Sequence, residues 1–128
     1  MNLFTPIDCY TGYGITGYNI WKHLYASDPE LTLFLMSKGN LEQSWDKDGL
    51  INSLSKQRQY NKNSPCLKIW QAHDLLLRPL GNSKYGALVF FETDSFTVEE
   101  NQGYNLVDII FMPTKWGRDT LINNNIKT

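Results

Sequence analysis

The chain has no excess of positive charge: 12 lysines and arginines stand against 13 aspartates and glutamates, a formal net charge of −1. Proteins that bind nucleic acid usually carry a basic patch or stripe, so this balance excludes nucleic acid as the expected partner. Cysteine is also scarce, with Cys9 and Cys66 as the two examples. Two thiols form neither a disulfide framework nor the ligand spacing of a zinc site, and we predict no metal site.

Long apolar runs are absent as well. No stretch approaches the roughly 20 residues that cross a bilayer, so we expect no transmembrane helix. The first residues, Met1–Pro6, lack the basic segment and the long apolar segment of a secretory signal peptide. These absences predict a soluble, cytoplasmic protein.

What the chain does contain is ordinary for a globular domain. Hydrophobic residues make up 41% of it and charged residues 20%, which excludes a disordered chain. A length of 128 residues fits one domain, which we expect to span residues 1–128.

Short apolar runs alternate with helix-like segments along the chain. The apolar runs suit parallel strands buried on both faces, and they predict strands near Leu3–Phe4 and at 31–36, 66–70, 87–91 and 107–112. Helices are predicted at 15–26, 50–59, 97–106 and 114–122. Thr97 and Glu100 have the spacing of a capping box, and Thr114 suits an N-cap. Residues 71–77 fit a loop or one helical turn, and residues 123–128 offer no further core element.

Strands that alternate with helices predict βαβ units. We therefore expect an α/β fold: a three-layer Rossmann-like domain with a mostly parallel sheet and helices on both faces. Such sheets bind ligands beyond the carboxyl ends of their strands. This rule selects four segments as candidate site regions: 11–14, 71–74, 92–96 and 113–116.

The first of these segments, Thr11-Gly12-Tyr13-Gly14, follows a strand and opens a helix. Glycines there allow a ligand to approach the backbone, and free helix N–H groups favour an anion such as phosphate. The loop is not a P-loop, because no Gly-Lys-Ser/Thr follows. The alternative interpretation is a simple turn with flexible glycines.

Titratable side chains follow two other strands. His73, beside Asp74, could donate a hydrogen bond to a substrate or carry a proton, and a surface loop histidine is the alternative. Glu92 follows the strand at 87–91 and could hold sugar hydroxyls or pair with a cation, whereas a merely polar strand exit is the alternative. Most tryptophans fit core positions, but Trp45, in a polar stretch, could stack on a sugar face.

The order of these segments resembles the N-terminal half of a GT-B glycosyltransferase, a class built from two Rossmann-like domains. The resemblance covers nearly the whole chain, and each motif alone is modest. The similar pieces are Tyr10-Thr11-Gly12-Tyr13-Gly14, Leu67-Lys68-Ile69-Trp70-Gln71-Ala72-His73-Asp74-Leu75, Val89-Phe90-Phe91-Glu92-Thr93-Asp94 and Asp108-Ile109-Ile110-Phe111-Met112-Pro113-Thr114-Lys115-Trp116.

The resemblance implies transfer of a sugar from a nucleotide-sugar to an acceptor, with the nucleotide-sugar as co-substrate and no cofactor or metal. It implies that His73, which would contact the transferred sugar, is catalytic and, with a less close match, that Glu92 is catalytic as well. It places Gly12, Tyr13 and Gly14 near the donor phosphates and the acceptor. Further substrate-binding positions are Asp74, Thr114 and Lys115.

The chain departs from the family in one large respect. The family binds its nucleotide-sugar mainly through a C-terminal domain with an Arg/Lys pair and a Glu-x7-Glu element. Glu92 and Glu100 have that spacing, but one is at a strand exit and the other in a capping box, so we take the match as chance. We expect this chain to stop before the nucleotide-sugar domain and to be inactive alone.

Two other classes of function stay open. One is a non-enzymatic Rossmann-like binding or oligomerisation domain, which would form a homodimer through the face that otherwise meets a second domain. The other is a small flavodoxin-like or receiver-like module. Its signals are poor, because the sequence shows neither an acidic cluster after the first strand nor a Ser/Thr-rich phosphate loop.

Overall fold

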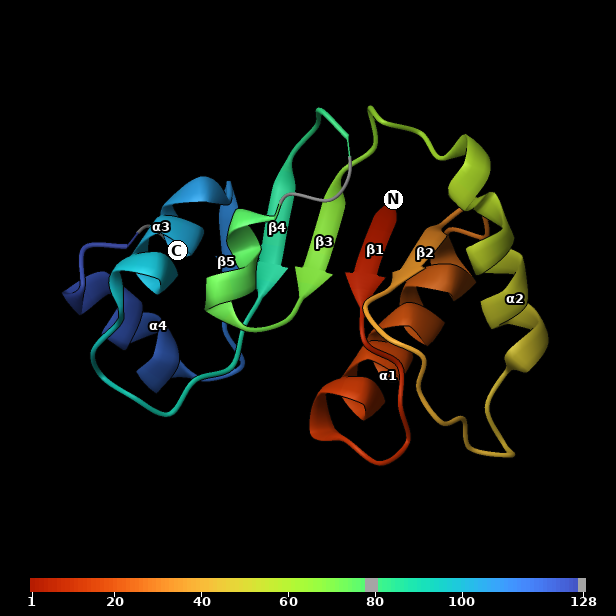
Figure 1. Cartoon of the computed structure of the whole chain (residues 1–128), viewed down its shortest axis with the longest axis horizontal. Helices are drawn as coiled ribbons and strands as arrows, with labels where there is room; N and C mark the ends of the chain where they lie inside the picture. Colours follow the sequence, from red (N-terminus) through yellow and green to blue (C-terminus); the bar gives the residue numbers. More distant parts are fainter. Residues whose placement is uncertain (78–80, 127–128) are drawn as a thin grey trace.

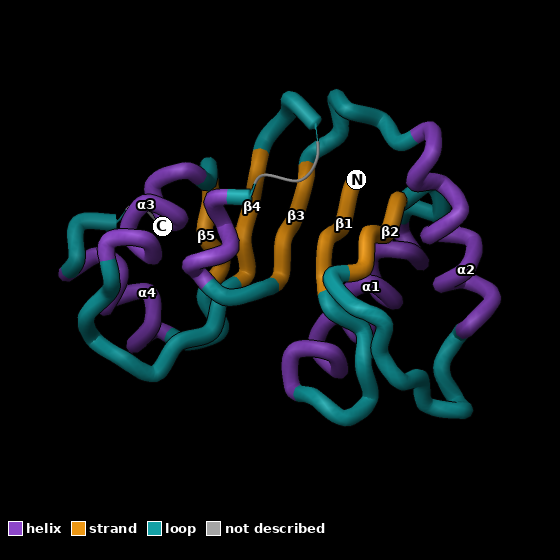
Figure 2. Tube along the Cα trace, viewed as in Figure 1, coloured by secondary structure: helices purple, strands orange, loops and turns teal. Residues whose placement is uncertain are grey.

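The computed structural model describes residues 1–77 and 81–126, which form one sheet with helices around it (Figures 1 and 2). Strands and helices alternate as the apolar runs predicted. In chain order the elements are β1 (Asn2–Thr5), α1 (Gly12–Ser27), β2 (Thr32–Leu35), α2 (Lys47–Ser55), the 3₁₀ helix η1 (Lys56–Gln59), β3 (Cys66–Ile69), the 3₁₀ helix η2 (Ala72–Leu76), β4 (Tyr85–Leu88), α3 (Val98–Leu106), β5 (Ile109–Phe111) and α4 (Lys115–Asn123).

All neighbouring strands run parallel, in the order β2-β1-β3-β4-β5. This confirms the predicted α/β fold with a parallel sheet. The order is the doubly wound one that flavodoxin-like sheets share. From β1 the chain steps to one side, to β2, and from β3 it steps to the other side, through β4 to β5. The direction therefore reverses between β1 and β3, and open sheets bind ligands at the carboxyl edge near such a reversal.

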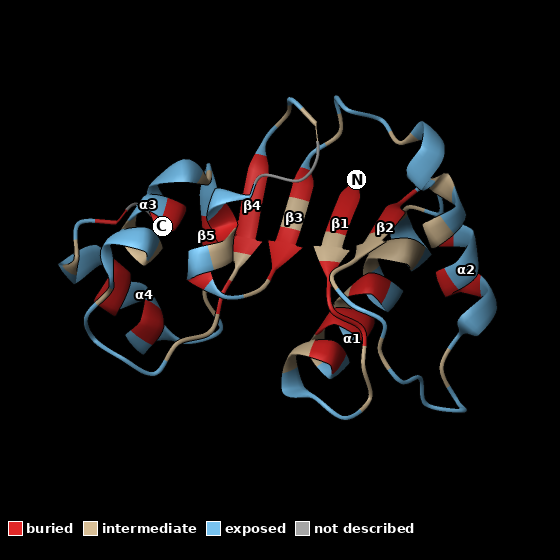
Figure 3. Cartoon of the chain, viewed as in Figure 1, coloured by how far each residue is buried: buried red, intermediate tan, exposed pale blue. Residues whose placement is uncertain are grey.

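Two hydrophobic cores lie on opposite faces of the sheet. On β3, Ile69 belongs to one core and Cys66 to the other, and residues three apart on a strand face opposite sides. The first core, here called the α1 core, contains Leu3, Ile7, Tyr18, Trp21, Leu31, Leu33, Leu50 and Ile69. The second, the α3 core, contains Cys66, Ala72, Leu75, Tyr85, Ala87, Val89, Tyr104, Ile110, Leu121 and Ile126. Figure 3 shows the buried strands between these helical layers, which confirms the predicted three-layer arrangement.

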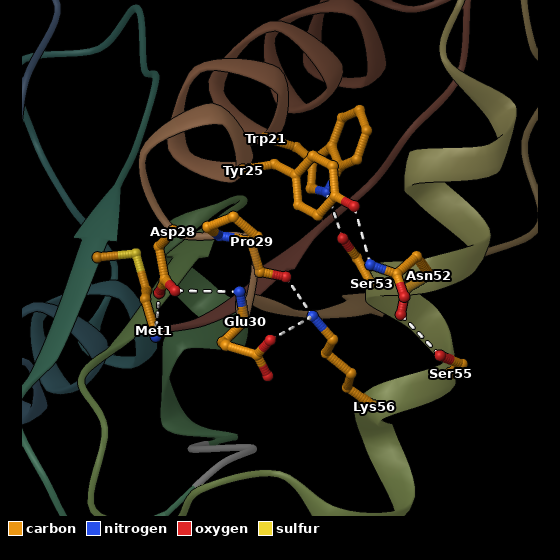
Figure 4. A network of polar contacts seen from close by, with 10 residues as sticks. All are labelled: Met1, Trp21, Tyr25, Asp28, Pro29, Glu30, Asn52, Ser53, Ser55 and Lys56. Atoms are coloured by element: carbon orange, nitrogen blue, oxygen red, sulfur yellow. Dashed lines mark hydrogen bonds and ion pairs between the residues drawn. The ribbon is translucent and has the colours of Figure 1, made fainter.

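Helix α1 begins three residues before the predicted start at 15, because Thr11 caps it. The Thr11 hydroxyl accepts a hydrogen bond from the Gly14 N–H at 3.0 Å, which satisfies a donor that the helix itself cannot. The helix packs against α2: the Trp21 indole N–H donates to the Ser53 hydroxyl at 3.0 Å, and the Asn52 amide donates to the Tyr25 hydroxyl at 2.8 Å (Figure 4).

The bounds of α2 and β4, and the placement of the Trp45 side chain, also differ from the sequence-based expectation. Helix α2 begins at Lys47 rather than at 50, since the Asp46 carboxylate accepts from the Gly49 N–H at 2.9 Å. Strand β4 covers Tyr85–Leu88 rather than 87–91, because it follows its register with β3, where Tyr85 lies opposite Cys66. Trp45 is not an open platform: it is half-buried and stacks on Tyr18, with ring centroids 4.0 Å apart.

The chain after α4 does add to the core, which corrects the expectation for residues 123–128 as far as Ile126. Asn125 takes a positive φ of 62°, a backbone conformation that asparagine tolerates and that commonly ends helices. The Ile126 N–H then donates to the Leu121 carbonyl at 2.9 Å. This Schellman turn folds Ile126 back into the α3 core beside Leu121.

Candidate functional site

A cleft of about 620 Å³ opens at the carboxyl ends of β3, β4 and β5. It lies at the edge of the sheet that the parallel-strand rule selects. Its walls come from all four segments chosen on that rule, together with Phe90, Phe91 and Met112, which directly precede two of them. The lining residues are Tyr13, Gln71, Phe90, Phe91, Glu92, Met112, Pro113, Thr114 and Trp116.

A cavity of similar size, about 660 Å³, lies at the opposite edge, near the amino ends of β1 and β2. Four of its five charged groups, all but Arg58, already pair with one another, as Figure 4 shows. The Met1 amino group is 3.0 Å from the Asp28 carboxylate and holds the pKa of that carboxyl below its ordinary value. The Lys56 ammonium donates to the Pro29 carbonyl and lies 3.8 Å from Glu30. We therefore take the carboxyl-edge cleft as the candidate site.

Aromatic rings form the walls of the cleft. The Tyr13 ring packs against both Trp70 and Phe90, with centroid distances of 4.9 and 5.1 Å. Its hydroxyl donates to the Phe90 carbonyl at 3.3 Å, and burial raises its pKa above the ordinary value. The segment after β4 supplies Phe91 and the start of α4 supplies Trp116, and their ring centroids are 5.8 Å apart. Trp116 is 51% exposed, so part of its ring is accessible to a ligand.

Trp116 is positioned by the start of α4. The Thr114 hydroxyl accepts from the Gly117 N–H at 3.0 Å, which confirms Thr114 as the N-cap. Gly117 permits this turn to approach Met112, since a Cβ there would lie 2.4 Å from the methionine methyl group. The cap therefore fixes the first turn of α4, and with it the indole, beside Phe91.

The polar groups of the cleft are few. Glu92 and Gln71 are both exposed, and neither side chain makes a hydrogen bond or an ion pair with another residue that the structure describes. The Gln71 backbone carbonyl accepts from the Asp74 N–H at 3.2 Å. The Thr114 oxygen already serves the helix cap. The Glu92 carboxylate and the Gln71 amide are thus available to the hydroxyl groups of a ligand.

The predicted pair His73 and Asp74 lies on η2, and neither residue lines the cleft. The Asp74 carboxylate accepts from the Trp70 indole N–H at 2.6 Å, and the His73 Nε2 lies 3.7 Å from its other oxygen. Because Trp70 packs against Tyr13, Asp74 supports the aromatic wall from behind. The structure therefore joins Asp74 to the cleft through Trp70 and leaves His73 at the surface.

A buried lysine holds η2 against the sheet. Lys68 on β3 is 1% exposed. Its ammonium donates to the carbonyls of Asp74 and Leu77 at 2.5 and 3.4 Å and lies 5.1 Å from the Phe4 ring centre. Burial lowers the pKa of Lys68 below its ordinary value. These contacts fix the segment that leads from Trp70 to Asp74.

The glycine loop has two different parts. Gly12 is exposed with open space around it, whereas a Cβ on Gly14 would lie 2.3 Å from the Asp8 carbonyl oxygen. Gly17 packs in the same way on Pro6. Positions 12, 14 and 17 have the G-x-G-x-x-G spacing of dinucleotide-binding loops. No acidic residue occurs at 33–39, around the end of β2, where such sites hold a ribose, and from residues 12–14 only Tyr13 lines the cleft.

Lys115 lines a neighbouring cavity of about 440 Å³, with Phe111 and Arg118 among the other lining residues. This cavity shares Met112, Pro113 and Thr114 with the cleft. The Arg118 guanidinium pairs with Asp119 at 2.8 Å. Lys115 therefore stands beside the cleft rather than in it.

Sequence reasoning missed several lining residues. Phe90 and Phe91 were expected inside a buried strand, but β4 ends at Leu88 and both rings line the cleft. Trp116 was assigned to the core and is half exposed. The signal that could have found it is its position just after the N-cap at the carboxyl end of β5.

The described residues, 1–77 and 81–126, contain no group of three or more His, Cys, Asp or Glu side chains that could hold a metal ion. Among the same residues, no helix is both long enough and apolar enough to span a bilayer. Comparisons with models of protein families, with curated proteins and with solved structures find no match to this chain.

Proposed function

We propose that this chain is the acceptor-binding domain of a nucleotide-sugar-dependent glycosyltransferase and that the cleft binds a sugar ring of the acceptor. One observation carries the proposal: at the carboxyl edge of a parallel sheet, accessible aromatic rings stand beside a carboxylate without a partner among the described residues. A sugar ring has C–H faces that pack on aromatic rings and hydroxyls that donate to carboxylates. Small-molecule sites typically combine such an apolar wall with a few polar groups.

In this proposal the cleft residues have different roles in binding the acceptor. Tyr13 and Trp116 contact the faces of the sugar, and Glu92 accepts a hydrogen bond from an acceptor hydroxyl. A carboxylate in that position could also take the hydroxyl proton as the oxygen attacks the donor sugar. The nucleotide-sugar would be held mainly by a second domain, as the resemblance implies. His73 lies outside the cleft, so we assign no acceptor contact to it.

We expect titration with mono- and disaccharides to change the tryptophan fluorescence of the wild-type chain. Trp116→Ala should weaken sugar binding about three- to tenfold, because an aromatic contact is worth roughly 0.5–1.5 kcal/mol. Glu92→Gln should weaken it by roughly tenfold or more, since a hydrogen bond to a charged group contributes about 1.5–3 kcal/mol. Isothermal titration calorimetry measures both effects.

Glu99→Gln is the matched control for Glu92→Gln, because Glu99 is exposed on α3 and does not line the cleft. It should bind sugar as the wild type does. If no sugar perturbs the chain, or if Trp116→Ala and Glu92→Gln both bind like the control, the cleft is not a sugar site.

A second candidate function is a binding or oligomerisation domain, and the edge strand β5 favours it. Ile109 and Phe111 are 45% and 48% exposed, while Ile110 between them is buried. Their side chains lie over Gly86, which has no side chain to cover them. Exposed apolar groups on an edge strand are a common pairing surface.

If that function holds, light scattering coupled to size-exclusion chromatography should give a dimer mass, and Phe111→Lys should return the chain to a monomer. A lysine on each copy places like charges in the shared interface. Ile122→Lys, at a 51% exposed position on α4, is the control and should leave the mass unchanged. A monomer at high micromolar concentration excludes oligomerisation through β5.

A further inference from the structure

A small cavity of about 180 Å³ lies between α2, the carboxyl ends of β1 and β2, and the loop that follows β2. Its lining is aliphatic apart from one lysine, and it shares no lining residue with the cleft. The lining residues are Ile7, Leu35, Leu41, Lys47, Leu50, Ile51 and Leu54.

The loop wall of this cavity is fixed by hydrogen bonds. The Asn40 N–H donates to the Asp8 carboxylate at 3.0 Å, and the Cys9 N–H donates to the Asn40 carbonyl at 2.8 Å. The loop also passes so close to the segment after β1 that a Cβ on Gly39 would lie 1.9 Å from the Ile7 carbonyl oxygen. Leu41, which follows directly, is held over the cavity by these contacts.

The helical wall is fixed as well. The Asp46 N–H donates to the Tyr18 hydroxyl at 2.9 Å, and Trp45 stacks on the Tyr18 ring. These contacts anchor the start of α2 to α1. Because both walls are held by groups outside the cavity, its shape is present before any ligand binds.

The mouth of the cavity is open to a ligand. Leu50 is 4% exposed and lies deep, whereas Leu41 and Ile51 are 41% and 63% exposed. Exposed aliphatic side chains that surround a cavity are more informative than the same residues scattered singly. They mark an apolar entrance with a buried floor.

We propose that this cavity binds a neutral aliphatic group of about six carbons. A cavity of roughly 150 Å³ with an aliphatic lining accepts benzene, so this volume suits a chain or ring of that size. The lining supplies no polar partner for a ligand apart from the Lys47 ammonium. Asp46 and Asp48 are the sequence neighbours of Lys47, so these three residues together carry a net charge of −1, which disfavours a carboxylate head group near the mouth. This site does not rest on the proposed sugar site.

The test is a titration of the wild-type chain with linear alcohols from butan-1-ol to decan-1-ol, followed by NMR of the backbone amides. Each added CH₂ should tighten binding about fourfold up to about six carbons, since burying one contributes about 0.8 kcal/mol. Beyond that length the dissociation constant should level off, and the shifted amides should belong to α2 and residues 35–41. Hexanoate should bind more weakly than hexan-1-ol.

Ile51→Trp should abolish hexan-1-ol binding, because the indole covers the mouth from a position whose exposure tolerates a larger side chain. Leu41→Trp closes the mouth from the loop side and should also abolish hexan-1-ol binding. Two independent variants are used so that a folding defect in one of them does not decide the result. Ile122→Trp, on α4, should bind like the wild type. The proposal is overturned if affinity rises with chain length without levelling off, if both mouth variants still bind, or if no alcohol shifts these amides.

Discussion

Trp21→Ala should lower the free energy of unfolding by about 3–5 kcal/mol, the usual cost of removing a large buried aromatic side chain. Trp21 is 0% exposed and stacks on Tyr25, with ring centroids 5.1 Å apart. Its truncation also leaves the Ser53 hydroxyl, which is 0% exposed, without its indole partner. Because a domain of this size is stable by only about 5–15 kcal/mol, urea unfolding followed by circular dichroism should show a large shift.

Two further variants identify the cause of this effect. Trp116→Ala removes a 51% exposed indole and should cost less than about 1 kcal/mol. Trp21→Phe keeps most of the ring but loses the hydrogen bond, so adding Ser53→Ala to it should cost much less than Ser53→Ala in the wild type. Equal losses for Trp21→Ala and Trp116→Ala would show that the α1–α2 contact does not carry this stability.

Features that depend on neighbouring residues in the chain could be predicted from the sequence. The capping box at α3 is one: the Thr97 N–H donates to Glu100 at 2.8 Å, and the Glu100 N–H donates back to Thr97 at 3.2 Å. This contact also explains why the spacing of Glu92 and Glu100 is chance, since Glu100 is committed to the cap. Such local chemistry is fixed by a few torsion angles, so the pattern of residues is sufficient.

Features that depend on distant partners could not be predicted. Trp45 and Asp46 look like part of a polar loop until Tyr18, far away in sequence, provides a ring and a hydroxyl for them. The bounds of β4 follow its pairing with β3 and β5 rather than the length of its apolar run. Strand order itself is a property of tertiary packing.

The candidate site shows the same division. The carboxyl-edge rule selected the regions of Gln71, Glu92 and Trp116, and these three side chains line one cleft. The rule did not say which residue of each region faces it. On η2 the backbone turns so that His73 reaches the surface while Asp74 meets Trp70. The sequence alone does not show which side chain contacts Trp70, so it could not predict that Asp74 faces the cleft wall while His73 faces solvent.

Gly14→Ala should lower the free energy of unfolding by about 1–3 kcal/mol, the usual cost of overpacking, whereas Gly12→Ala should change it by less than about 0.5 kcal/mol. A methyl group on Gly14 would lie 2.3, 2.4 and 2.7 Å from the O, N and Cα atoms of Asp8. Backbone atoms cannot rotate away as a side chain can. Around Gly12 there is no atom within 4 Å of the same position.

These two variants also separate two roles for the glycine loop. If the loop exists to let a ligand approach the backbone, Gly12→Ala should reduce ligand binding without a loss of stability. If it exists to let α1 approach β1, Gly14→Ala should destabilise the chain and displace Tyr13, which follows Gly12 and forms the wall of the cleft. We expect the second pattern, because the Gly14 N–H is already bound to Thr11 and is not available to an anion. Urea unfolding and sugar titration on the same two proteins decide between them, and a stable Gly14→Ala variant with wild-type sugar binding would contradict the packing role.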